Sequence, residues 1–412
     1  MNEVGERIAG EIADKGAITF ARFMDLALYC PIYGYYEKEE DIIGRRGDYY
    51  TNVSVGSLFG ELLAFQFAEW LQQIQEVRTE TSEPDWAGAA GGRSEVMRIV
   101  EAGAHRGDLA RDILGWLRKH RPGIFDRLEY WIVEPSERSR SRQQRRLCDY
   151  GNIVHWAEAM AGATGGALPG FRGILFSNEL LDAMPVHLLG WDAKARVWFE
   201  WGVTSHAGRL AWTRMFDGAL GPAIHQSSAC ASMSHFELPI EMGLLDTLPD
   251  GFTTEVCPAA EEWWRTAARA LACGKLLTFD YGLRAEEFFM PERKAGTVRG
   301  YHRHQPGNDV LAHPGDQDIT AHVNFTAIQT AGESAGLRTD AFLPQAQFLT
   351  SIAARMWGEA GSLGEWTPGH TRQFQTLTHP EHLGRPFRVL VQSRICDYRA
   401  SGAKDTRTEA RD

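Results

Sequence analysis

Apolar positions change their spacing along the chain, and the change predicts where helices and strands alternate. Over residues 2–30, and again over 56–74, apolar side chains recur every three or four positions, as on one face of a helix. From residue 96 onwards, short apolar runs alternate with amphipathic segments. Predicted strands cover 96–100, 130–133, 152–156, 173–178 and 274–282, and predicted helices cover 108–119, 136–147 and 259–272. This order predicts an α/β fold, a parallel sheet with helices on both faces.

Two segments interrupt the alternation and divide the chain. Residues 79–95 are polar, small and glycine-rich, as in a linker. Residues from about 190 to 257 alternate apolar and polar positions around several tryptophans, which predicts hairpins inserted between the fourth and fifth strands. The sequence therefore predicts an N-terminal helical region over 1–78, the linker, a sheet domain over 96–397 that carries the insertion, and a disordered tail over 398–412.

Composition narrows the class of protein. The net charge of -11 argues against a nucleic-acid binder, which normally carries a basic surface. No apolar run approaches the roughly 18 residues that span a bilayer. The six cysteines form no C-x-x-C pair, so no metal site is predicted. The first residues mix acidic and basic side chains, unlike a targeting peptide. We therefore expect a cytoplasmic protein.

A glycine turn follows the first predicted strand. A dinucleotide turn, G-x-G-x-x-G, would need glycine at 103, 105 and 108, but His105 and Asp108 occupy two of these positions. Asp108 would also repel a pyrophosphate. The pattern E-x-G-x-G-x-G matches at Glu101, Gly103 and Gly107, and suits the cationic cofactor S-adenosylmethionine; a purely structural turn is the alternative. We expect a negative φ at His105, which any residue tolerates.

Polar residues also follow the second and fourth predicted strands. Glu134 could accept hydrogen bonds from both ribose hydroxyls of a nucleoside, or could simply lie at the start of a helix. Asn178 would face the reactive end of a cofactor. Glu179 and Asp182, three residues apart on a predicted helical turn, could hold a cationic substrate or accept a proton. Alternatively, both carboxylates only cap that helix.

Seven segments together resemble the MidA-like family of S-adenosylmethionine-dependent methyltransferases, in colinear order over about 16–350. They are "ALYCPIYGYY", "GRRGDYYTN...LFG", "VEAGAHRGDLARDIL", "IVEPSERSRSRQQRRL", "SNELLDAMPVH", "FDYG" and "DITAHVNFTAI". The resemblance implies a class I methyltransferase (Rossmann-like) sheet with an N-terminal helical lid and an inserted β-rich segment. Mitochondrial members of the family assist assembly of respiratory complex I, which implies methylation of arginine on a complex subunit.

The resemblance also implies roles for single residues. Gly103 and Gly107 would flank the methionine part of the cofactor, and Glu134 would hold its ribose. Gly47, Asp48 and Thr51 would form the lid, Asn178, Glu179 and Asp182 would line the methyl-transfer site, and His322 and Phe325 would close its other side. Because they belong to the same turn, Glu101 and His105 are also candidate cofactor-binding residues. Asp280, in "FDYG", is predicted to be structural or to pair with the lid. The family has glycine where His105 stands, and Ser-Pro-Glu where residues 52–54 read Asn-Val-Ser, which removes a carboxylate from the lid.

Three functions remain open at this point. The leading hypothesis is an enzyme that methylates arginine on a protein, with S-adenosylmethionine as cofactor. The second is an assembly chaperone without catalysis, which the histidine in the glycine turn would favour. The third is a small-molecule methyltransferase, for which the tryptophan-rich insertion could supply an apolar pocket.

Overall fold

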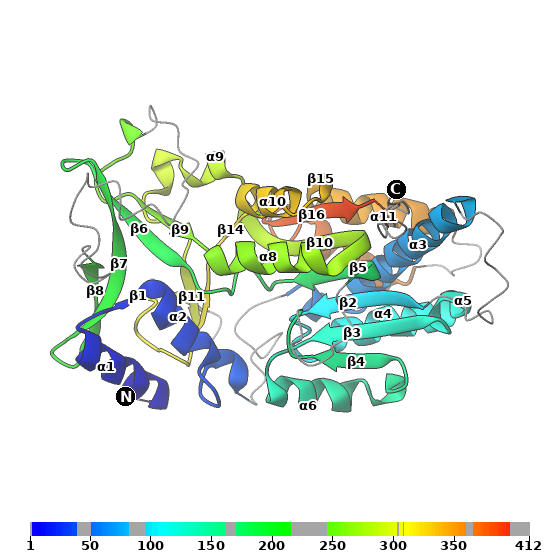
Figure 1. Cartoon of the computed structure of the whole chain (residues 1–412), viewed down its shortest axis with the longest axis horizontal. Coiled ribbons are helices and arrows are strands. Elements are labelled where there is room, and N and C mark those ends of the chain that lie inside the picture. The colour runs from blue at the N-terminus through cyan, green and yellow to red at the C-terminus, as the bar shows by residue number, and fades with distance from the viewer. Residues whose placement is uncertain are drawn as a thin grey trace, which may run out of the picture.

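The computed structural model describes most of the 412-residue chain: residues 2–38, 51–81, 96–160, 170–215, 245–302, 305–307, 309–359 and 366–395. Two predicted lid residues, Gly47 and Asp48, lie outside these ranges. So do the predicted tail, 398–412, and residues 82–95 of the predicted linker. Figure 1 shows an elongated molecule with one sheet near each end of its long axis.

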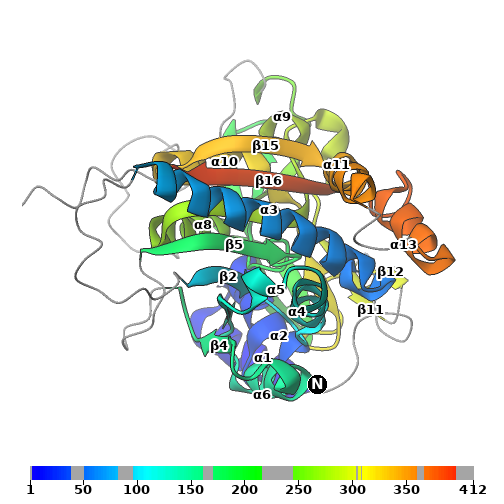
Figure 2. The same ribbon diagram turned by 90° about the vertical axis from the view of Figure 1, so that its right-hand side faces the viewer.

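The larger sheet has the strand order β15-β16-β10-β5-β2-β3-β4, with β14 beside β10 (Figure 2). β2, β3, β4, β5 and β10 are mutually parallel, whereas β16 runs antiparallel to both of its neighbours. The strands are β2 (Met97–Ala102), β3 (Leu128–Val133), β4 (Val154–Ala157), β5 (Phe171–Asn178), β10 (Leu271–Leu283), β14 (Val323–Asn324), β15 (Arg338–Pro344) and β16 (Phe387–Arg394). The predicted fold class is confirmed, but the sheet is mixed rather than wholly parallel.

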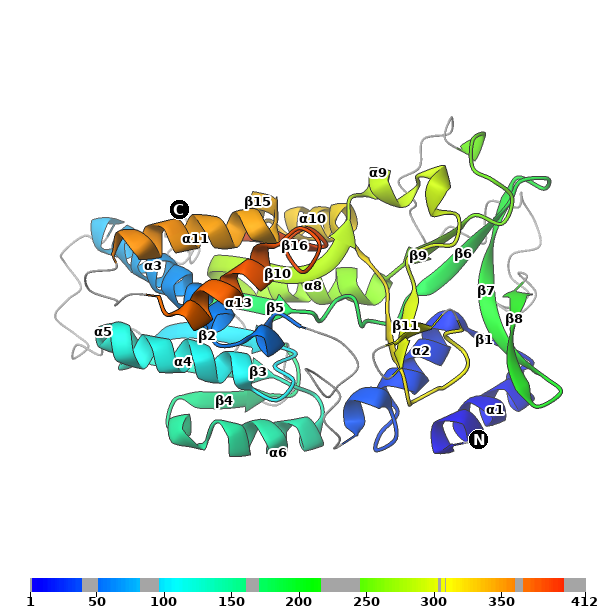
Figure 3. The same ribbon diagram turned by 180° about the vertical axis from the view of Figure 1, so that it is seen from behind.

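Helices cover both faces of the larger sheet. One face carries α3 (Leu58–Thr81), α4 (Asp108–His120) and α11 (Gln345–Gly358), which lie in front of the strands in Figure 3. The other face carries α8 (Pro258–Ala270) and α10 (Phe325–Ser334). Successive side chains of a strand point to opposite faces, so Ile99 packs under the first group and Val100 under the second. Each face therefore has its own buried core.

A second lobe is built around the smaller sheet. Its strand order is β1-β7-β6-β9, with β8 paired to β7, and all of its pairs are antiparallel. Its strands are β1 (Ile18–Thr19), β6 (His187–Asp192), β7 (Val197–His206), β8 (Arg209–Met215) and β9 (Thr253–Val256). The hairpins predicted for the insertion are thus present. A small sheet of β11 (Arg299–His302), β12 (Gln305–Gly307) and β13 (Asp318–Thr320) lies between the lobes.

The predicted N-terminal region is divided between the two lobes. α1 (Glu3–Lys15) and α2 (Phe20–Tyr29) share a buried core with β6, β7 and β13. α3, in contrast, packs on the larger sheet and extends past the predicted boundary at residue 78. Along the described stretches, no helix combines the length and the apolar character that a bilayer span requires.

Short helices complete the connections. They are α5 (Pro122–Phe125), α6 (Glu137–Arg146), α9 (Ala285–Phe288), α13 (Pro368–Thr378) and the 3-10 turns η1 (Tyr35–Glu37), η2 (Val53–Val55), η4 (Cys148–Tyr150) and η7 (Pro291–Arg293). α6 runs between β3 and β4 and brings its first residues close to the end of β3. α13 packs against α11 and α3, beside η2.

Candidate active site

The carboxyl ends of β2, β3, β5 and β10 meet at one edge of the larger sheet. The chain order reverses here, because β2 lies between β3 and β5. The helix after β2 packs on one face of the sheet, and the helix before β10 packs on the other. In open α/β sheets such a reversal leaves a crevice where ligands bind. The predicted cofactor and transfer residues at 101–107, 134 and 178–182 all lie at this edge.

The turn after β2 uses glycine where the backbone requires it. Gly103 and Gly107 have φ of 73° and 82°, in the left-handed region that L side chains disfavour. Gly107 donates its N–H to the Ala104 carbonyl at 2.7 Å and immediately precedes α4. The turn is therefore tight, and Leu180 and Leu147 pack where a Cβ on Gly103 or Gly107 would lie.

His105 also adopts the left-handed conformation, with φ of 46°. The expectation of a negative φ was wrong. The Gly107 to Ala104 hydrogen bond closes a four-residue turn with His105 at its second position, where only the primed turn types have a positive φ. Gln143 Nε2 holds the His105 carbonyl in this conformation. Histidine is among the residues that enter this region more often than most, although it is strained there relative to glycine.

Because of this strain, we expect His105→Gly to raise the free energy of unfolding by about 1 kcal/mol and to change cofactor affinity less than about tenfold. Chemical denaturation and calorimetric titration with S-adenosylmethionine would measure the two effects. Ala207→Gly is a matched control, since Ala207 has φ of 50° in the hairpin between β7 and β8. It should stabilise the fold and leave affinity unchanged. A less stable His105→Gly variant would show that contacts of the imidazole outweigh the strain.

Glu101 is buried at the end of β2, with 3% of its surface exposed. The Tyr130 hydroxyl donates to its Oε2 at 2.7 Å. Burial raises the pKa of Glu101 to about 7, although the Tyr130 hydrogen bond acts in the opposite direction. One oxygen of this predicted cofactor ligand is thus already held by the protein.

Glu134 follows β3 and is linked to the glycine turn by a glutamine that the sequence did not single out. The Ser136 N–H donates to Glu134 Oε1, and Gln143 Nε2 donates to Oε2, both at 3.0 Å. Gln143 Nε2 also donates to the His105 carbonyl at 3.0 Å, and Trp156 Nε1 donates to Gln143 Oε1. Burial raises the pKa of Glu134. Gln143, which is fully buried, therefore fixes the Glu134 carboxyl relative to the turn.

Asn178 ends β5, and Glu179 and Asp182 lie on the tight turn that follows it rather than on a helix. Glu179 has φ of 53°, and Met184 donates its N–H to the Leu181 carbonyl. The alternative in which the two acids cap a helix is therefore wrong. Asp280 holds this turn, since its carboxyl accepts the N–H groups of Leu181 and Tyr281, both at 2.9 Å. Its predicted structural role fits this position.

Glu179 and Asp182 face one cavity of about 540 Å³ between the two lobes. A further buried carboxyl, Asp318, lines it from β13. The Tyr36 hydroxyl donates to Asp318 Oδ1 at 2.7 Å. The remaining lining is aromatic, polar or apolar, with Arg299 as a cationic member: Tyr281, Thr297, Arg299, Tyr301, Thr320, Ala321, His322, Thr376, His382, Leu383 and Pro386.

The carboxyl groups of this cavity are harder to ionise than ordinary carboxyl groups. Burial, followed by the neighbouring Asp182 carboxyl, raises the pKa of Glu179 to about 8. Burial, followed by Asp280 and Asp318, holds the pKa of Asp182 well above its usual range. Burial also lowers the pKa of His322 to about 4, so its imidazole is neutral. A bound cation would favour the ionised carboxylates, because it offsets both the burial and their mutual repulsion.

Asn52 ties the segment before α3 to this cavity. It is fully buried, and its N–H donates to Glu179 Oε1 at 3.1 Å. Thr51, predicted as a lid residue, is also buried, and its hydroxyl accepts the Ser54 N–H at 3.0 Å. His322 lines the cavity, but Phe325 does not close it: its ring is buried against Phe342, with the ring centres 5.0 Å apart.

Sequence reasoning missed Asp318, Gln143 and Asn52. Asp318 lies in a strand of three residues, too short for an apolar pattern to mark. Gln143 is one of several polar residues on α6, and its orientation depends on β3 and β4. Each still carried a weak signal: Asn52 is a departure from the family pattern, and Asp318 and Gln143 lie within two of the segments that resemble the family.

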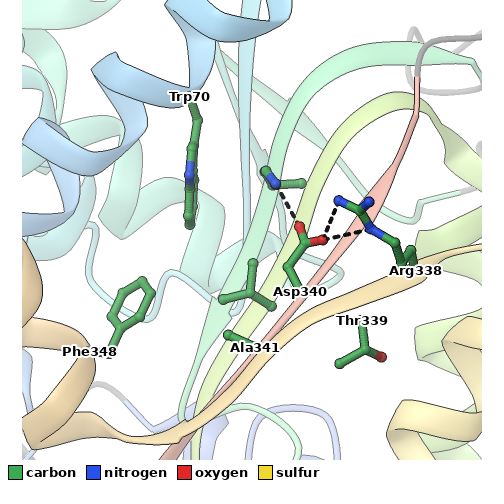
Figure 4. A pocket seen from close by; sticks show the side chains of 8 residues that line it. Trp70, Arg338, Thr339, Asp340, Ala341 and Phe348 are labelled. Atoms are coloured by element: carbon green, nitrogen blue, oxygen red, sulfur yellow. Dashed lines mark hydrogen bonds and ion pairs between the residues drawn. The ribbon is translucent and has the colours of Figure 1, made fainter.

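A second depression lies at the opposite end of the larger sheet (Figure 4). Its charges are matched within the protein, since Asp340 accepts from Lys275 Nζ at 2.6 Å and from Arg338 Nη2 at 2.9 Å. Trp70 and Phe348 form its apolar side. It is next to the start of β10, whereas Glu179 follows the end of β5. This depression therefore lies at the edge of the sheet opposite the candidate active site.

Comparisons with known proteins agree with the site. Residues 62–343 match a family described as "Putative S-adenosyl-L-methionine-dependent methyltransferase". The chain is 26% identical to "Protein arginine methyltransferase NDUFAF7 homolog, mitochondrial" of Drosophila melanogaster, over 94% of this chain and 84% of that protein. It is also 26% identical to the NDUFAF7 protein arginine methyltransferase of Danio rerio, over 79% and 70%.

A solved structure is also similar to this chain. A protein of Burkholderia thailandensis bound to S-adenosyl-homocysteine is 29% identical, with a TM-score of 0.74, over 96% of this chain and 92% of that one. A ligand-bound protein with this fold favours an enzyme over a chaperone without a cofactor.

The predicted cytoplasmic location is contradicted, because the curated relatives are named mitochondrial. That prediction relied on the absence of targeting and membrane-spanning patterns, and such an absence is compatible with more than one compartment. The family match covers most of the chain and agrees with the reversal of strand order, the glycine turn and the acidic cavity. The chain belongs to this family of S-adenosyl-L-methionine-dependent methyltransferases.

Proposed function

We propose that this enzyme transfers a methyl group from S-adenosylmethionine to a guanidinium nitrogen of an arginine in a protein. The observation that carries the proposal is the cavity lined by Glu179, Asp182 and Asp318. A guanidinium is a planar cation with several N–H donors, and carboxylates are its preferred partners. The cavity also presents the tyrosine rings 36, 281 and 301, against which a guanidinium plane can stack.

The edge of the larger sheet fits the cofactor. Gly103 and Gly107 have the positive φ values that a tight turn between β2 and α4 requires at these positions. We propose that the turn from Glu101 to Gly107, His105 included, holds the methionine part, and that Glu134 accepts hydrogen bonds from the ribose hydroxyls. When bound, the cofactor supplies a methyl group on a cationic sulfur, a good leaving group.

The residues of this chain would supply alignment and a proton acceptor. We propose that Glu179 and Asp182 ionise as the guanidinium enters, and orient one of its nitrogens towards the methyl. Asn178 and Asn52 donate to Glu179 Oε1. Within the described part of the chain, no hydrogen bond reaches Oε2, which leaves it for the substrate. As the N–C bond forms, the nitrogen loses a proton, and Glu179 is placed to accept it.

The names of the relatives support a protein as the acceptor, since both are protein arginine methyltransferases. We propose in addition that the acceptor is a subunit of respiratory complex I. This finer proposal rests on the family resemblance alone.

The proposal is tested by incubating the enzyme with S-adenosylmethionine and arginine-containing peptides. Mass spectrometry should find the added methyl on arginine, and an otherwise identical peptide with lysine should gain none. Methylation of lysine peptides at a similar rate would contradict the role of the cavity. Transfer only to small molecules in a cell extract would favour the small-molecule methyltransferase instead.

The ionisation of Glu179 gives the reaction a pH dependence. Its pKa is raised to about 8 in the substrate-free site, so the carboxyl is mostly protonated at neutral pH and binds a cation poorly. We expect kcat/KM for an arginine peptide to rise with pH until it levels off near this pKa, because kcat/KM reports ionisations of the free enzyme. Steady-state rates between about pH 6 and 9.5 would measure it. A profile that falls over this range would contradict a required carboxylate.

A further inference from the structure

Glu179 is the end of a chain of three amide side chains that begins at Gln345, the first residue of α11. Gln345 Nε2 donates to Asn52 Oδ1 at 2.7 Å, and Asn52 Nδ2 donates to Asn178 Oδ1 at 3.0 Å. Asn178 Nδ2 then donates to Glu179 Oε1 at 2.9 Å. Asn52 and Asn178 each receive a hydrogen bond at the oxygen and give one from the nitrogen, and Gln345 gives one from its nitrogen, so all three amides point the same way.

The first member of this amide chain is held by the protein. Gln345 begins α11, and its Nε2 also donates to the Leu377 carbonyl of α13 at 3.2 Å. Gln345 and Asn52 are both fully buried. Among the described residues, Gln345 Oε1 has no hydrogen-bond partner, which leaves a buried acceptor unsatisfied. Burying these two amides costs free energy that apolar side chains in the same space would not cost, so packing alone does not account for them.

An oriented amide chain fixes the group at its end. An amide can present either oxygen or nitrogen to a neighbour, and a carboxylate is stabilised only by the nitrogen. If Asn178 turned around, its oxygen would face Glu179 Oε1 and repel the charge. Asn52 prevents this, because its own nitrogen occupies the Asn178 oxygen. Gln345 in turn keeps Asn52 from turning.

We propose that Asn52 and Gln345 are positioning residues that act through Asn178 to hold the Glu179 carboxyl ready for the substrate. This inference rests on the proposed role of Glu179 and adds that its orientation is set from α11. The departure from the family pattern at position 52 fits this role, because Asn52 stands where the family has serine and brings a side-chain amide to Asn178.

The test follows the titration of Glu179 without any substrate. Other charged or titratable groups face the same cavity from the turn itself, from η1, from β10, from the small sheet, from the segment after β13 and from the segment after α13. They are Tyr36, Asp182, Asp280, Tyr281, Arg299, Tyr301, Asp318, His322 and His382. The Glu179→Gln variant isolates the one group of interest. The free energy of unfolding of each background, minus that of the same background with Glu179→Gln, is measured as a function of pH.

The sign of the expected curve follows from the pKa. Glu179 binds its proton more tightly in the folded protein than in the unfolded chain, where its pKa is near 4.5. The difference should therefore fall as pH rises above about 4.5 and level off near pH 8 in the wild type. Loss of an oriented donor makes ionisation harder. In Asn52→Ala, the levelling-off point should move up by about one pH unit.

Gln345→Met should shift the levelling-off point in the same direction by a smaller amount, because it acts one amide further away. The double variant should shift it no more than Asn52→Ala alone, as expected for members of one chain. Gln392→Met is the matched control. Gln392 is also fully buried, and it also donates to a main-chain carbonyl. It lies opposite Leu276 near the start of β10, away from the edge of the sheet that carries Glu179. It should lower stability and leave the levelling-off point unchanged.

An unchanged levelling-off point in both Asn52→Ala and Gln345→Met would overturn the inference. So would a wild type whose difference from Glu179→Gln does not vary with pH. If Gln345→Met fails to fold, Asn52→Ala still decides, because the Asn52 main-chain N–H remains in place. Failure to methylate arginine peptides would reject the proposed function and leave these unfolding measurements untouched.

Discussion

Glu179→Gln should lower turnover on an arginine peptide by about 100-fold or more and leave the affinity for S-adenosylmethionine nearly unchanged. The amide keeps the size of the side chain. Its oxygen can still accept the hydrogen bonds from the Asn52 and Asn178 nitrogens that now reach Oε1. The variant loses only the ability to ionise, to offset the guanidinium charge and to accept a proton. Steady-state rates and calorimetric titration with the cofactor would measure the two effects separately.

Asp182→Asn should lower turnover in the same way, because Asp182 lines the same cavity. Asp340→Asn is the control for this change. Asp340 pairs with Lys275 and Arg338 in the depression of Figure 4, at the opposite end of the sheet. We expect the Asp340→Asn variant to lose about 1 kcal/mol of stability and to keep its turnover unchanged. If Glu179→Gln turns over at the wild-type rate, the cavity holds the guanidinium without this carboxylate, and Asp182 and Asp318 become the candidates.

The strands that carry the cofactor edge could be predicted from the sequence because their signal is local. A buried parallel strand is a short apolar run, and the runs at 96–100 and 173–178 correspond to β2 and β5. β16 has the same kind of run, but it returns antiparallel after a long excursion through α11 and α13. No period in the sequence shows which neighbour such a strand will choose.

Contacts between distant segments could not be predicted. α1 and α2 pack on the insertion although more than 150 residues separate them from β6, and only the burial of their apolar faces requires it. Asp108 is a single residue whose contact with a distant segment was also not predicted. The sequence suggested a free carboxylate that repels phosphate, but Arg146 Nε donates to Asp108 Oδ1 at 2.7 Å. The argument against a dinucleotide therefore rests on the glycine spacing alone.

The sequence also did not predict the backbone conformation of two site residues. His105 and Glu179 both have positive φ, at 46° and 53°, although neither is glycine. Each is in a turn that immediately follows a central parallel strand and is closed by hydrogen bonds to a neighbouring element: Gln143 to the His105 carbonyl, and the Glu179 N–H to the Phe279 carbonyl. Strained backbone of this kind persists where surrounding contacts impose it, and it gathers at functional sites.

Glu134→Ala should weaken binding of S-adenosylmethionine by about 1.5–3 kcal/mol, the range for hydrogen bonds to a charged group. That corresponds to an affinity about tenfold to 150-fold lower. The carboxyl lies at the end of β3, is 9% exposed and is fixed by Ser136 and Gln143. A ligand hydroxyl would therefore meet an acceptor that needs no reorientation. The fold should survive, because the residue follows the strand and fills no part of the apolar cores.

Two further variants separate the loss of the acceptor from damage to the turn. Glu134→Gln keeps an oxygen for the Ser136 N–H but removes the charge, so we expect a smaller loss of affinity in the same direction. Glu129→Ala is the control on the same strand: Glu129 pairs with Arg98 on the surface, and its loss should leave affinity unchanged. Calorimetry with S-adenosyl-homocysteine would compare all three in folded protein. Equal affinity in Glu134→Ala and the wild type would remove Glu134 from the cofactor site and leave the glycine turn to hold the cofactor alone.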